Sequence, residues 1–195
     1  MRIVPPVEVE SFRILRSRVD TSGLAPCTRA VTERVIHASA DLEYARDLVC
    51  EEAALRAGWA ALHGGAPVVV DVRMLAAGIT SRAVVVALDL PGSPVEGLTR
   101  TAAGIRCAAG RYPDGAVWVV GNAPTGLREL LRLAADGLVR PALVVGLPVG
   151  LVDAVEAKAA LRASGLPAVS NRSAKGGAAV AAAVVNALLY LPSVQ

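Results

Sequence analysis

The chain has few aromatic residues, few histidines and few cysteines. Aromatic residues make up 3% of its 195 residues, and it has 2 histidines and 3 cysteines. Cys27, Cys50 and Cys107 are far apart and form no Cys-x-x-Cys pair, so neither a disulfide framework nor a structural zinc site is predicted. The net charge is only +3 and the basic residues are scattered, which argues against nucleic acid as a partner and fits a small polyanionic ligand.

The sequence also lacks a hydrophobic run long enough to cross a membrane, although 54% of its residues are hydrophobic. The longest apolar run, 178–191, is broken by Asn186 and is shorter than the roughly 20 residues that a spanning helix needs. The N-terminus has no apolar core of signal-peptide length. We therefore expect one cytoplasmic domain over residues 1–195, with no membrane partner.

Short apolar runs alternate with helical patterns from Pro67 onward. Unlike half-exposed strands, these runs are continuously apolar, as is typical of strands covered on both faces; they span 68–70, 84–88, 117–120, 143–145 and 167–169. Helices are predicted over 7–20, 26–37, 41–62, 95–109, 124–135, 151–164 and 177–190. This order predicts a single α/β domain, in which a doubly wound and mostly parallel sheet has helices on both faces.

His37 is the first candidate for acid–base chemistry, because an imidazole with a reference pKa of about 6.5 can exchange a proton near neutral pH. The second histidine, His63, precedes a Gly-Gly stop at the end of a helix that we expect to begin at an Asp41 N-cap, which places it in the cap region or on the surface. On spacing alone, a histidine among Val, Ile and Ala is more often a satisfied core residue. The role of His37 therefore depends on the sequence around it.

Ligands of doubly wound sheets bind beyond the carboxyl ends of the strands. Asn122 and Thr125 lie in the loop after the third predicted strand and have two interpretations. They belong to a loop whose free N–H groups receive a carboxylate or phosphate, or they cap the helix that follows. The spacing favours neither interpretation over the other. Neither a Gly-x-Gly-x-x-Gly nor a P-loop lysine pattern occurs. Arg172 and Lys175 lie beside two glycines at a helix start, which makes that loop the better anion-site candidate.

Two further groups of charges have simpler interpretations. Arg100 opens a helical segment, where it either binds a carboxylate in a two-pronged contact or is solvated, and spacing favours solvation. Asp153, Glu156 and Lys158 are interpreted as ordinary electrostatics on a helix surface.

The segment 34–41 reads Arg-Val-Ile-His-Ala-Ser-Ala-Asp and resembles the histidine motif of the precorrin-8X methylmutases, the corrin-ring isomerases of cobalamin biosynthesis. Further motifs follow in family order over 10–15, 64–68, 74–80, 98–103, 120–125, 145–150, 156–158, 176–177 and 186–188. The sequence departs from the family pattern at Ala157, where a serine is usual, and at Leu151, where phenylalanine is common. It also lacks an acid near Ser17, and its segment between Thr80 and Thr99 is shorter than typical.

The resemblance implies an isomerase that moves a methyl group between neighbouring carbons of one pyrrole ring of a tetrapyrrole. Its substrate is precorrin-8X, converted to hydrogenobyrinate, or cobalt-precorrin-8, converted to cobyrinate, with no methyl donor, metal or other cofactor. His37 is the implied general acid. The implied hydrogen-bond donors to the acetate and propionate arms are Ser11, Thr80, Arg100, Asn122, Thr125 and Arg172. A homodimer with its sites near the interface is also implied.

Two alternatives remain open from the sequence. A non-catalytic corrinoid-binding carrier would keep the apolar slot and the donors without turning substrate over. An enzyme of Rossmann type that acts on a phosphate ligand would use the same loops, although the missing glycine motif argues against it. The metal-free and cobalt-loaded substrates are not distinguished by these motifs.

Overall fold

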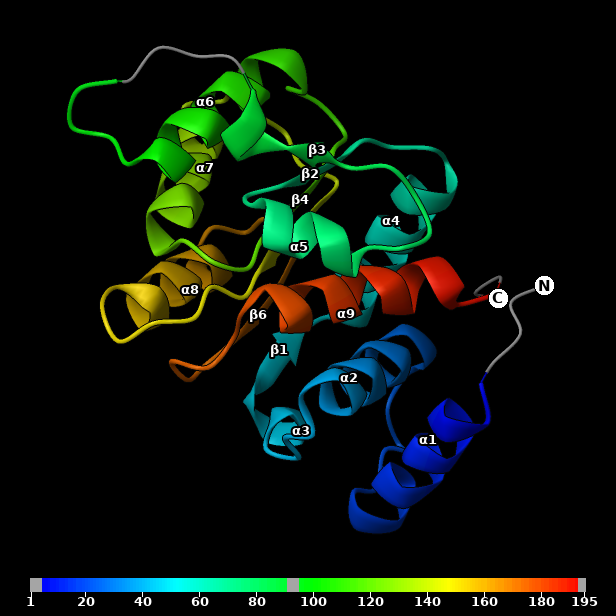
Figure 1. Ribbon diagram of the computed structural model, residues 1–195. Helices are drawn as coiled ribbons and strands as arrows, with labels where there is room; N and C mark the ends of the chain where they lie inside the picture. Colours follow the sequence, from blue (N-terminus) through cyan, green and yellow to red (C-terminus); the bar gives the residue numbers. More distant parts are fainter. Residues whose placement is uncertain (1–4, 91–94, 193–195) are drawn as a thin grey trace.

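The computed structural model describes residues 5–90 and 95–192 (Figure 1). Residues 1–4, on which part of the signal-peptide prediction rests, and 91–94, within the shortened segment before Thr99, lie outside the described residues. The helices are α1 Pro6–Arg18, α2 Pro26–Ser39, α3 Tyr44–Asp47, α4 Glu52–His63, α5 Arg73–Gly78, the 3₁₀-helix η1 Ala87–Asp89, α6 Arg100–Arg111, α7 Pro124–Ala135, α8 Ala154–Ala163 and α9 Ala178–Tyr190. The strands are β1 Leu48–Cys50, β2 Val68–Val70, β3 Val85–Val86, β4 Val117–Val120, β5 Leu143–Gly146 and β6 Ala168–Asn171.

The strands form one six-stranded sheet in the order β1-β6-β5-β4-β2-β3. All neighbours are parallel except β1, which pairs antiparallel with β6 and places Val49 opposite Ser170. In the parallel part, Val119 of β4 pairs with Val70 of β2 on one side and with Val145 of β5 on the other. The predicted α/β fold with a mostly parallel sheet is confirmed.

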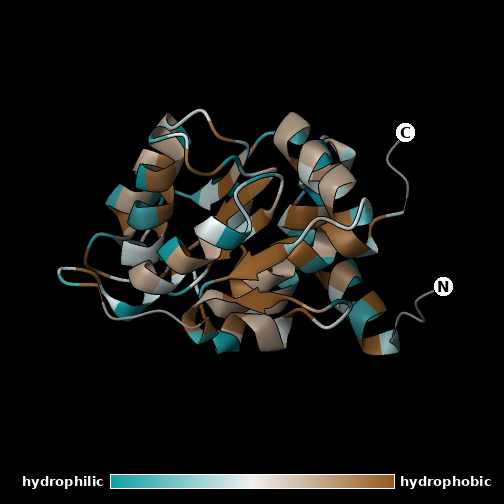
Figure 2. Cartoon of the chain, turned by 90° about the horizontal axis from the view of Figure 1, so that it is seen from above, coloured by the Kyte–Doolittle hydropathy of each residue, from teal (hydrophilic) through white to brown (hydrophobic). Residues whose placement is uncertain are grey.

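Helices cover both faces of the sheet, which explains why the strand sequences are apolar at every position. In β4, Val117 and Val119 face a core that they share with α2, α4, α5 and α9, whereas Trp118 and Val120 face a second core under α6, α7 and α8. Figure 2 shows the strongly hydrophobic residues concentrated in these central strands and the hydrophilic residues mainly on the outer helices. The sheet is therefore a rigid platform whose strand ends can carry a site.

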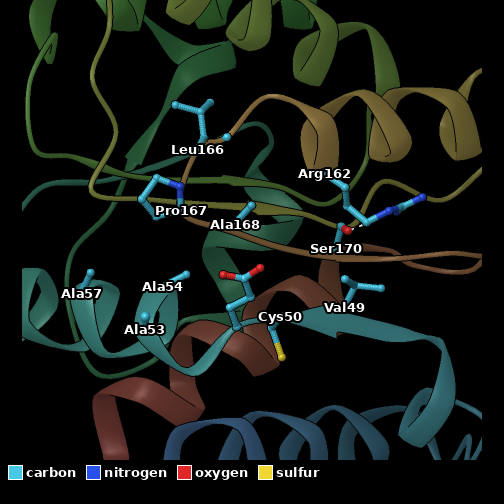
Figure 3. Close-up of a pocket in the computed structure, with 12 residues that line it drawn as sticks. Val49, Cys50, Ala53, Ala54, Ala57, Arg162, Leu166, Pro167, Ala168 and Ser170 are labelled. Carbon is cyan, nitrogen blue, oxygen red and sulfur yellow. Dashed lines mark hydrogen bonds between the residues drawn. The ribbon is translucent and has the colours of Figure 1, made fainter.

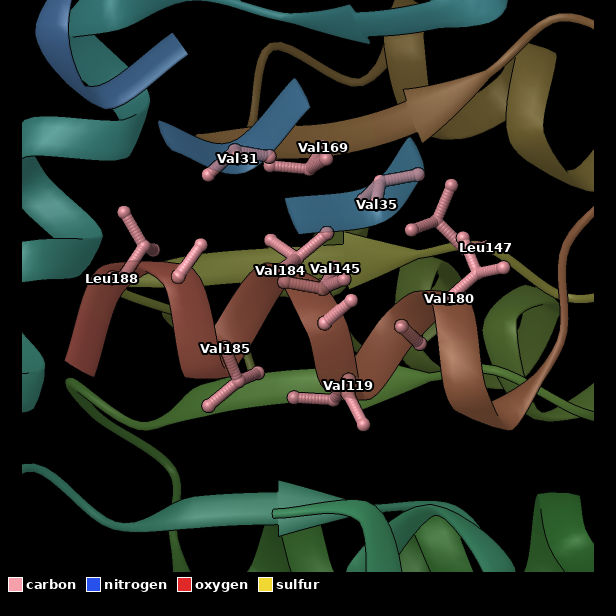
Figure 4. Close-up of a cluster of buried hydrophobic side chains, with 14 of the residues drawn as sticks. Val31, Val35, Val119, Val145, Leu147, Val169, Val180, Val184, Val185 and Leu188 are labelled. Atoms are coloured by element: carbon pink, nitrogen blue, oxygen red, sulfur yellow. The ribbon is translucent and has the colours of Figure 1, made fainter. Parts of the chain in front are cut away.

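The Ala-rich helix α9 is the centre of the first core, where it packs against α2 (Figure 4). Val31 of α2 lies toward Leu188, and Val35 lies toward Leu147 and Val180, so α2 and α9 run in opposite directions. The end of α2 that carries His37 therefore points toward the start of α9, at the edge where the parallel strands end. None of the described helices has the length and hydrophobicity that a membrane span requires.

The single helix predicted over 41–62 is wrong. Asp41 is not an N-cap: its Oδ1 accepts the N–H of Glu43 at 3.0 Å in a turn, and the chain then forms α3, β1 and α4. The strand Leu48–Cys50 is short, and it is created by its pairing with β6, a tertiary contact that local periodicity does not encode. The short helix α5 was likewise not predicted.

Candidate functional site

The imidazole of His37 lies half-buried in the last turn of α2, where two residues of α1 hold it. Ser11 Oγ lies 2.7 Å from Nδ1, and the Phe12 ring stacks on the imidazole with ring centroids 5.1 Å apart and an interplanar angle of 18°. At this distance the hydroxyl either donates to a neutral Nδ1 or accepts from a protonated one. Ser11 and Phe12 therefore fix the orientation of the ring in both protonation states.

A row of contacts leads from His37 to Thr80, through side chains that the sequence did not single out for function. The Arg34 guanidinium lies 5.2 Å from the centroid of Phe12 and 5.5 Å from that of Tyr190, within the range of cation–π attraction. The Tyr190 hydroxyl is 3.0 Å from Thr80 Oγ1. The structure thus connects His37, Ser11 and Thr80 through Phe12, Arg34 and Tyr190.

The end of α2 is tied to the loop between β6 and α9. Lys175 Nζ in that loop donates to Asp41 Oδ2 at 2.6 Å and also to the Glu43 carboxylate. These two hydrogen bonds raise the pKa of Lys175 above its usual value. The prediction that Lys175 forms an anion site for a ligand is therefore corrected, because its charge is already paired within the chain.

The loop between β4 and α7 is organised by a buried carboxylate, Asp71, at the end of β2. Asp71 Oδ2 accepts the backbone N–H of Asn122 at 2.8 Å and that of Ala123 at 3.1 Å. Burial raises the pKa of Asp71, although these N–H donors oppose the shift. The predicted free N–H groups are therefore occupied, and Asn122 does not cap α7, whose N-cap position is Ala123.

The side chains of Asn122, Thr125 and Arg100 are exposed where β4 passes into α7 and where α6 begins. Thr125 Oγ1 is 2.8 Å from Oγ1 of Thr99, the N-cap residue of α6, so the two helix starts are joined. Since parallel strands end at one edge of a sheet, these side chains share that edge with the loop after β6.

The loop after β6 is held from the protein interior by Lys158, whose side chain is buried and does not lie on a helix surface. The Lys158 side chain is fully buried, and its Nζ donates to Asn171 Oδ1 at 2.8 Å, to the Ser173 carbonyl at 2.5 Å and to the Lys175 carbonyl at 2.7 Å. Burial lowers the pKa of Lys158 to about 8. The surface interpretation of Lys158 is therefore wrong.

Asp47 holds the same loop from the other side. Its carboxylate accepts the backbone N–H of Arg172 at 2.9 Å and that of Ser173 at 2.8 Å, and it also accepts Asn171 Nδ2 at 2.8 Å. The Arg172 side chain is exposed, with Nη1 3.5 Å from the Arg46 carbonyl oxygen. Arg172 thus projects from a loop whose backbone is fixed on two sides.

A cavity of about 420 Å³ lies elsewhere, between β1, α4 and the start of β6 (Figure 3). Figure 3 shows alanines of α4 across the cavity from Leu166 and Pro167. Its lining residues are Val49, Cys50, Glu51, Ala53, Ala54, Ala57, Arg162, Gly165, Leu166, Pro167, Ala168 and Ser170. None of the predicted site residues is among them, so this cavity is separate from the His37 cluster.

Comparison with known proteins matches almost the whole chain to one family. The family model described as CbiC, precorrin-8X methylmutase, matches residues 6–191. The cobalt-precorrin-8 methylmutase of Methanocaldococcus jannaschii is 40% identical over 163 residues, which cover 82% of this chain and 77% of that protein. The precorrin-8X methylmutase of Pseudomonas aeruginosa is 38% identical over 191 residues, which cover 92% and 91%.

The solved structures agree with the sequence matches. The precorrin-8X methylmutase of Thermus thermophilus superposes with a TM-score of 0.87 at 37% identity, covering 94% of this chain and 93% of that one. The fold and the relatives together define an α/β isomerase that transfers a methyl group within one molecule. More narrowly, the chain belongs to the precorrin-8X methylmutase family, a family of isomerases in cobalamin biosynthesis.

Proposed function

We propose that this isomerase moves a methyl group between adjacent carbons of its corrin-precursor substrate with His37 as the general acid. The observation that carries the proposal is the 2.7 Å contact between Ser11 Oγ and His37 Nδ1, together with the Phe12 stack. Because Ser11 engages Nδ1, the proton passes to the substrate from Nε2. His63 has a different setting: it is exposed, and its Nε2 lies 3.3 Å from the Leu188 carbonyl oxygen.

Protonation of a ring nitrogen withdraws electrons from the conjugated macrocycle and lowers the barrier to migration. One carbon–methyl bond breaks while another forms on the neighbouring carbon, so substrate and product are isomers and the chain supplies no atom. General acid–base catalysis contributes typically about 10²–10⁴-fold, and the remaining acceleration comes from holding the macrocycle in a reactive shape.

The carboxylate arms of the substrate need hydrogen-bond donors around an apolar slot. Arg100, Asn122, Thr125 and Arg172 support this role, because they are exposed in loops and helix starts at the strand-end edge. Ser11 and Thr80 lie at the two ends of the row of contacts that includes His37. Each charge-assisted hydrogen bond contributes roughly 1.5–3 kcal/mol.

We also propose a cytoplasmic homodimer. Cys27 and Cys50 are free thiols, as is usual in a reducing compartment. Leu151 and Val152, in the loop between β5 and α8, are 98% and 83% exposed, and such contiguous apolar side chains favour burial against a second copy. Sedimentation at several protein concentrations measures the oligomeric state.

The proposed activity is tested by mixing the purified protein with precorrin-8X, and separately with its cobalt form, while the visible spectrum is followed. Methyl migration rearranges the conjugated double bonds, so turnover changes the colour. A catalytic change with one form supports the isomerisation and identifies the preferred substrate. A spectral change that stops at one equivalent of ligand would instead support the carrier.

The replacement His37→Ala should abolish turnover and leave product affinity nearly unchanged, because it removes the proton donor but no carboxylate contact. The matched control is His63→Ala, which also removes a helix-terminal histidine next to an aromatic ring: the His63 and Trp59 centroids are 4.5 Å apart, with the rings tilted by 30°. We expect the control to keep wild-type turnover. An active His37→Ala enzyme would refute the general-acid assignment.

The replacement Arg100→Ala should weaken binding of the product about tenfold, because it removes one charge-assisted hydrogen bond. Arg111→Ala, at the exposed far end of the same helix, is the control and should bind normally. A titration of hydrogenobyrinate followed by visible absorption measures both dissociation constants. Equal affinities of the two variants would remove Arg100 from the substrate contacts.

A further inference from the structure

Lys158 is a buried ammonium whose three hydrogen bonds all go to one short segment, 171–175. They reach the side chain of Asn171 and the backbone carbonyls of Ser173 and Lys175. A charged lysine has three N–H donors, and here each has an acceptor. The charge is therefore used to fix the course of this segment.

Asp47 also binds the segment 171–175, so the backbone of the segment is held in a clamp formed by two charged side chains, Asp47 and Lys158. Asp47 Oδ1 accepts the N–H groups of Arg172 and Ser173, while Lys158 binds the carbonyls of Ser173 and Lys175. Asn171 joins the two charges, because its Oδ1 accepts from Lys158 and its Nδ2 donates to Asp47 Oδ2. Arg172 lies within this clamp, and its side chain extends to the surface.

Burying a charge to hold a loop costs desolvation free energy. Apolar residues that replace both partners of a buried ion pair often stabilise a protein as well or better, so stability alone does not explain why such a pair is present, even though the loss of one partner is destabilising. An ammonium does provide three directed bonds to carbonyl oxygens, which an apolar side chain cannot. Such bonds matter where the orientation of an exposed neighbour decides function.

We propose that Lys158 is a positioning residue that holds Arg172 in the orientation in which it binds a carboxylate arm of the substrate. This inference rests on the proposed function of Arg172 in the site. Lys158 itself does not touch the substrate, because its side chain is fully buried. It acts through the side chain of Asn171, just before Arg172, and through the backbone carbonyls of Ser173 and Lys175, which follow it.

The test is a double-mutant cycle on product affinity, using Lys158→Met, Arg172→Ala and the double variant, with hydrogenobyrinate as the ligand. Arg172→Ala should weaken binding about tenfold, and Lys158→Met should do the same because it misplaces the same guanidinium. The double variant should also bind about tenfold more weakly, not the roughly hundredfold that independent effects would give. Arg100 is the control: Lys158→Met combined with Arg100→Ala should give the full product of the two losses.

Each other outcome overturns the inference in a recognisable way. Independent losses for Lys158 and Arg172 would show that Lys158 supports the fold without positioning Arg172. An unchanged affinity in Arg172→Ala would remove Arg172 from the site, while His37→Ala and Arg100→Ala still test the proposed function. If Lys158→Met does not fold, Asp47→Asn replaces it, since it weakens the clamp on Arg172 from the opposite side, and the same cycle applies.

Discussion

The two loops that end at the proposed site are held by buried charges of opposite sign. In the loop after β4, the carboxylate of Asp71 accepts the N–H groups of Asn122 and Ala123. In the loop after β6, the ammonium of Lys158 donates to the carbonyls of Ser173 and Lys175. A loop can thus be fixed through its donors or through its acceptors.

The difference decides what each loop can offer a ligand. The Asp71 carboxylate occupies backbone N–H groups of the loop after β4, so our proposal assigns the binding of a carboxylate arm there to side chains such as Asn122 and Thr125. The loop after β6 is held on both sides by Lys158 and Asp47 and is the more constrained of the two. We therefore expect changes in the loop after β6 to have the larger effects.

The largest effect on stability is expected for Gly176→Ala. A Cβ at Gly176 would lie 2.2 Å from the Leu147 carbonyl oxygen and 2.9 Å from that of Pro148, and its φ of 153° disfavours other residues. A Cβ at Gly121, in the loop after β4, would meet no carbonyl oxygen: it would lie 2.9 Å from both Ala181 Cβ and Leu75 Cδ1 and 3.1 Å from Ala178 Cα, and the leucine end can rotate away. We expect Gly121→Ala to cost about 1–3 kcal/mol of unfolding free energy and Gly176→Ala more. Urea unfolding measures both, and equal losses would contradict the comparison.

A smaller loss is expected for Asp71→Ala, which leaves two backbone N–H groups without their acceptor and should cost about 2 kcal/mol or more. Asp71→Asn keeps one acceptor oxygen and should cost less.

The pH dependence of stability tests the burial of Asp71. Because burial raises the folded-state pKa of Asp71 above its unfolded-state value, the native state binds the proton more tightly. The contribution of Asp71 to stability therefore falls as the pH rises from the unfolded-state pKa through the folded-state pKa. Asp71→Asn should lack this fall. Unfolding curves at acidic and neutral pH that remain parallel for wild type and Asp71→Asn would refute the assignment.

The parts of the fold that the sequence predicted are those that depend on local patterns. Continuously apolar residues in 68–70 and 117–120 indicated covered strands, and Pro124 marked the first residue of α7. The strand Leu48–Cys50 was missed because it exists through its pairing with a partner over 100 residues later in the chain.

The site was predicted unevenly for a related reason. The resemblance selected His37 and Ser11, which the structure places in contact, but the ring contacts of Phe12 and Tyr190 depend on how α1, α2 and α9 pack. Lys158 did have a local signal. It lies on α8 four residues after Ala154 and three before Leu161, both buried, so helical periodicity alone places it on the interior face.

The smallest effect on stability is expected for Lys175→Met, although Lys175 lies in the same loop as the carbonyls bound by Lys158. Its ion pairs with Asp41 and Glu43 are at the surface, where solvent and salt screen them, and exposed pairs contribute little to unfolding free energy. Urea unfolding at low and high salt should therefore show a small loss that salt abolishes, whereas the loss in Lys158→Met should persist at high salt. If the two lysine variants were equally destabilised at both salt concentrations, the surface ion pairs would stabilise the loop as much as the buried ammonium does. Lys158 could then no longer be compared with Asp71 as the main charge that fixes its loop.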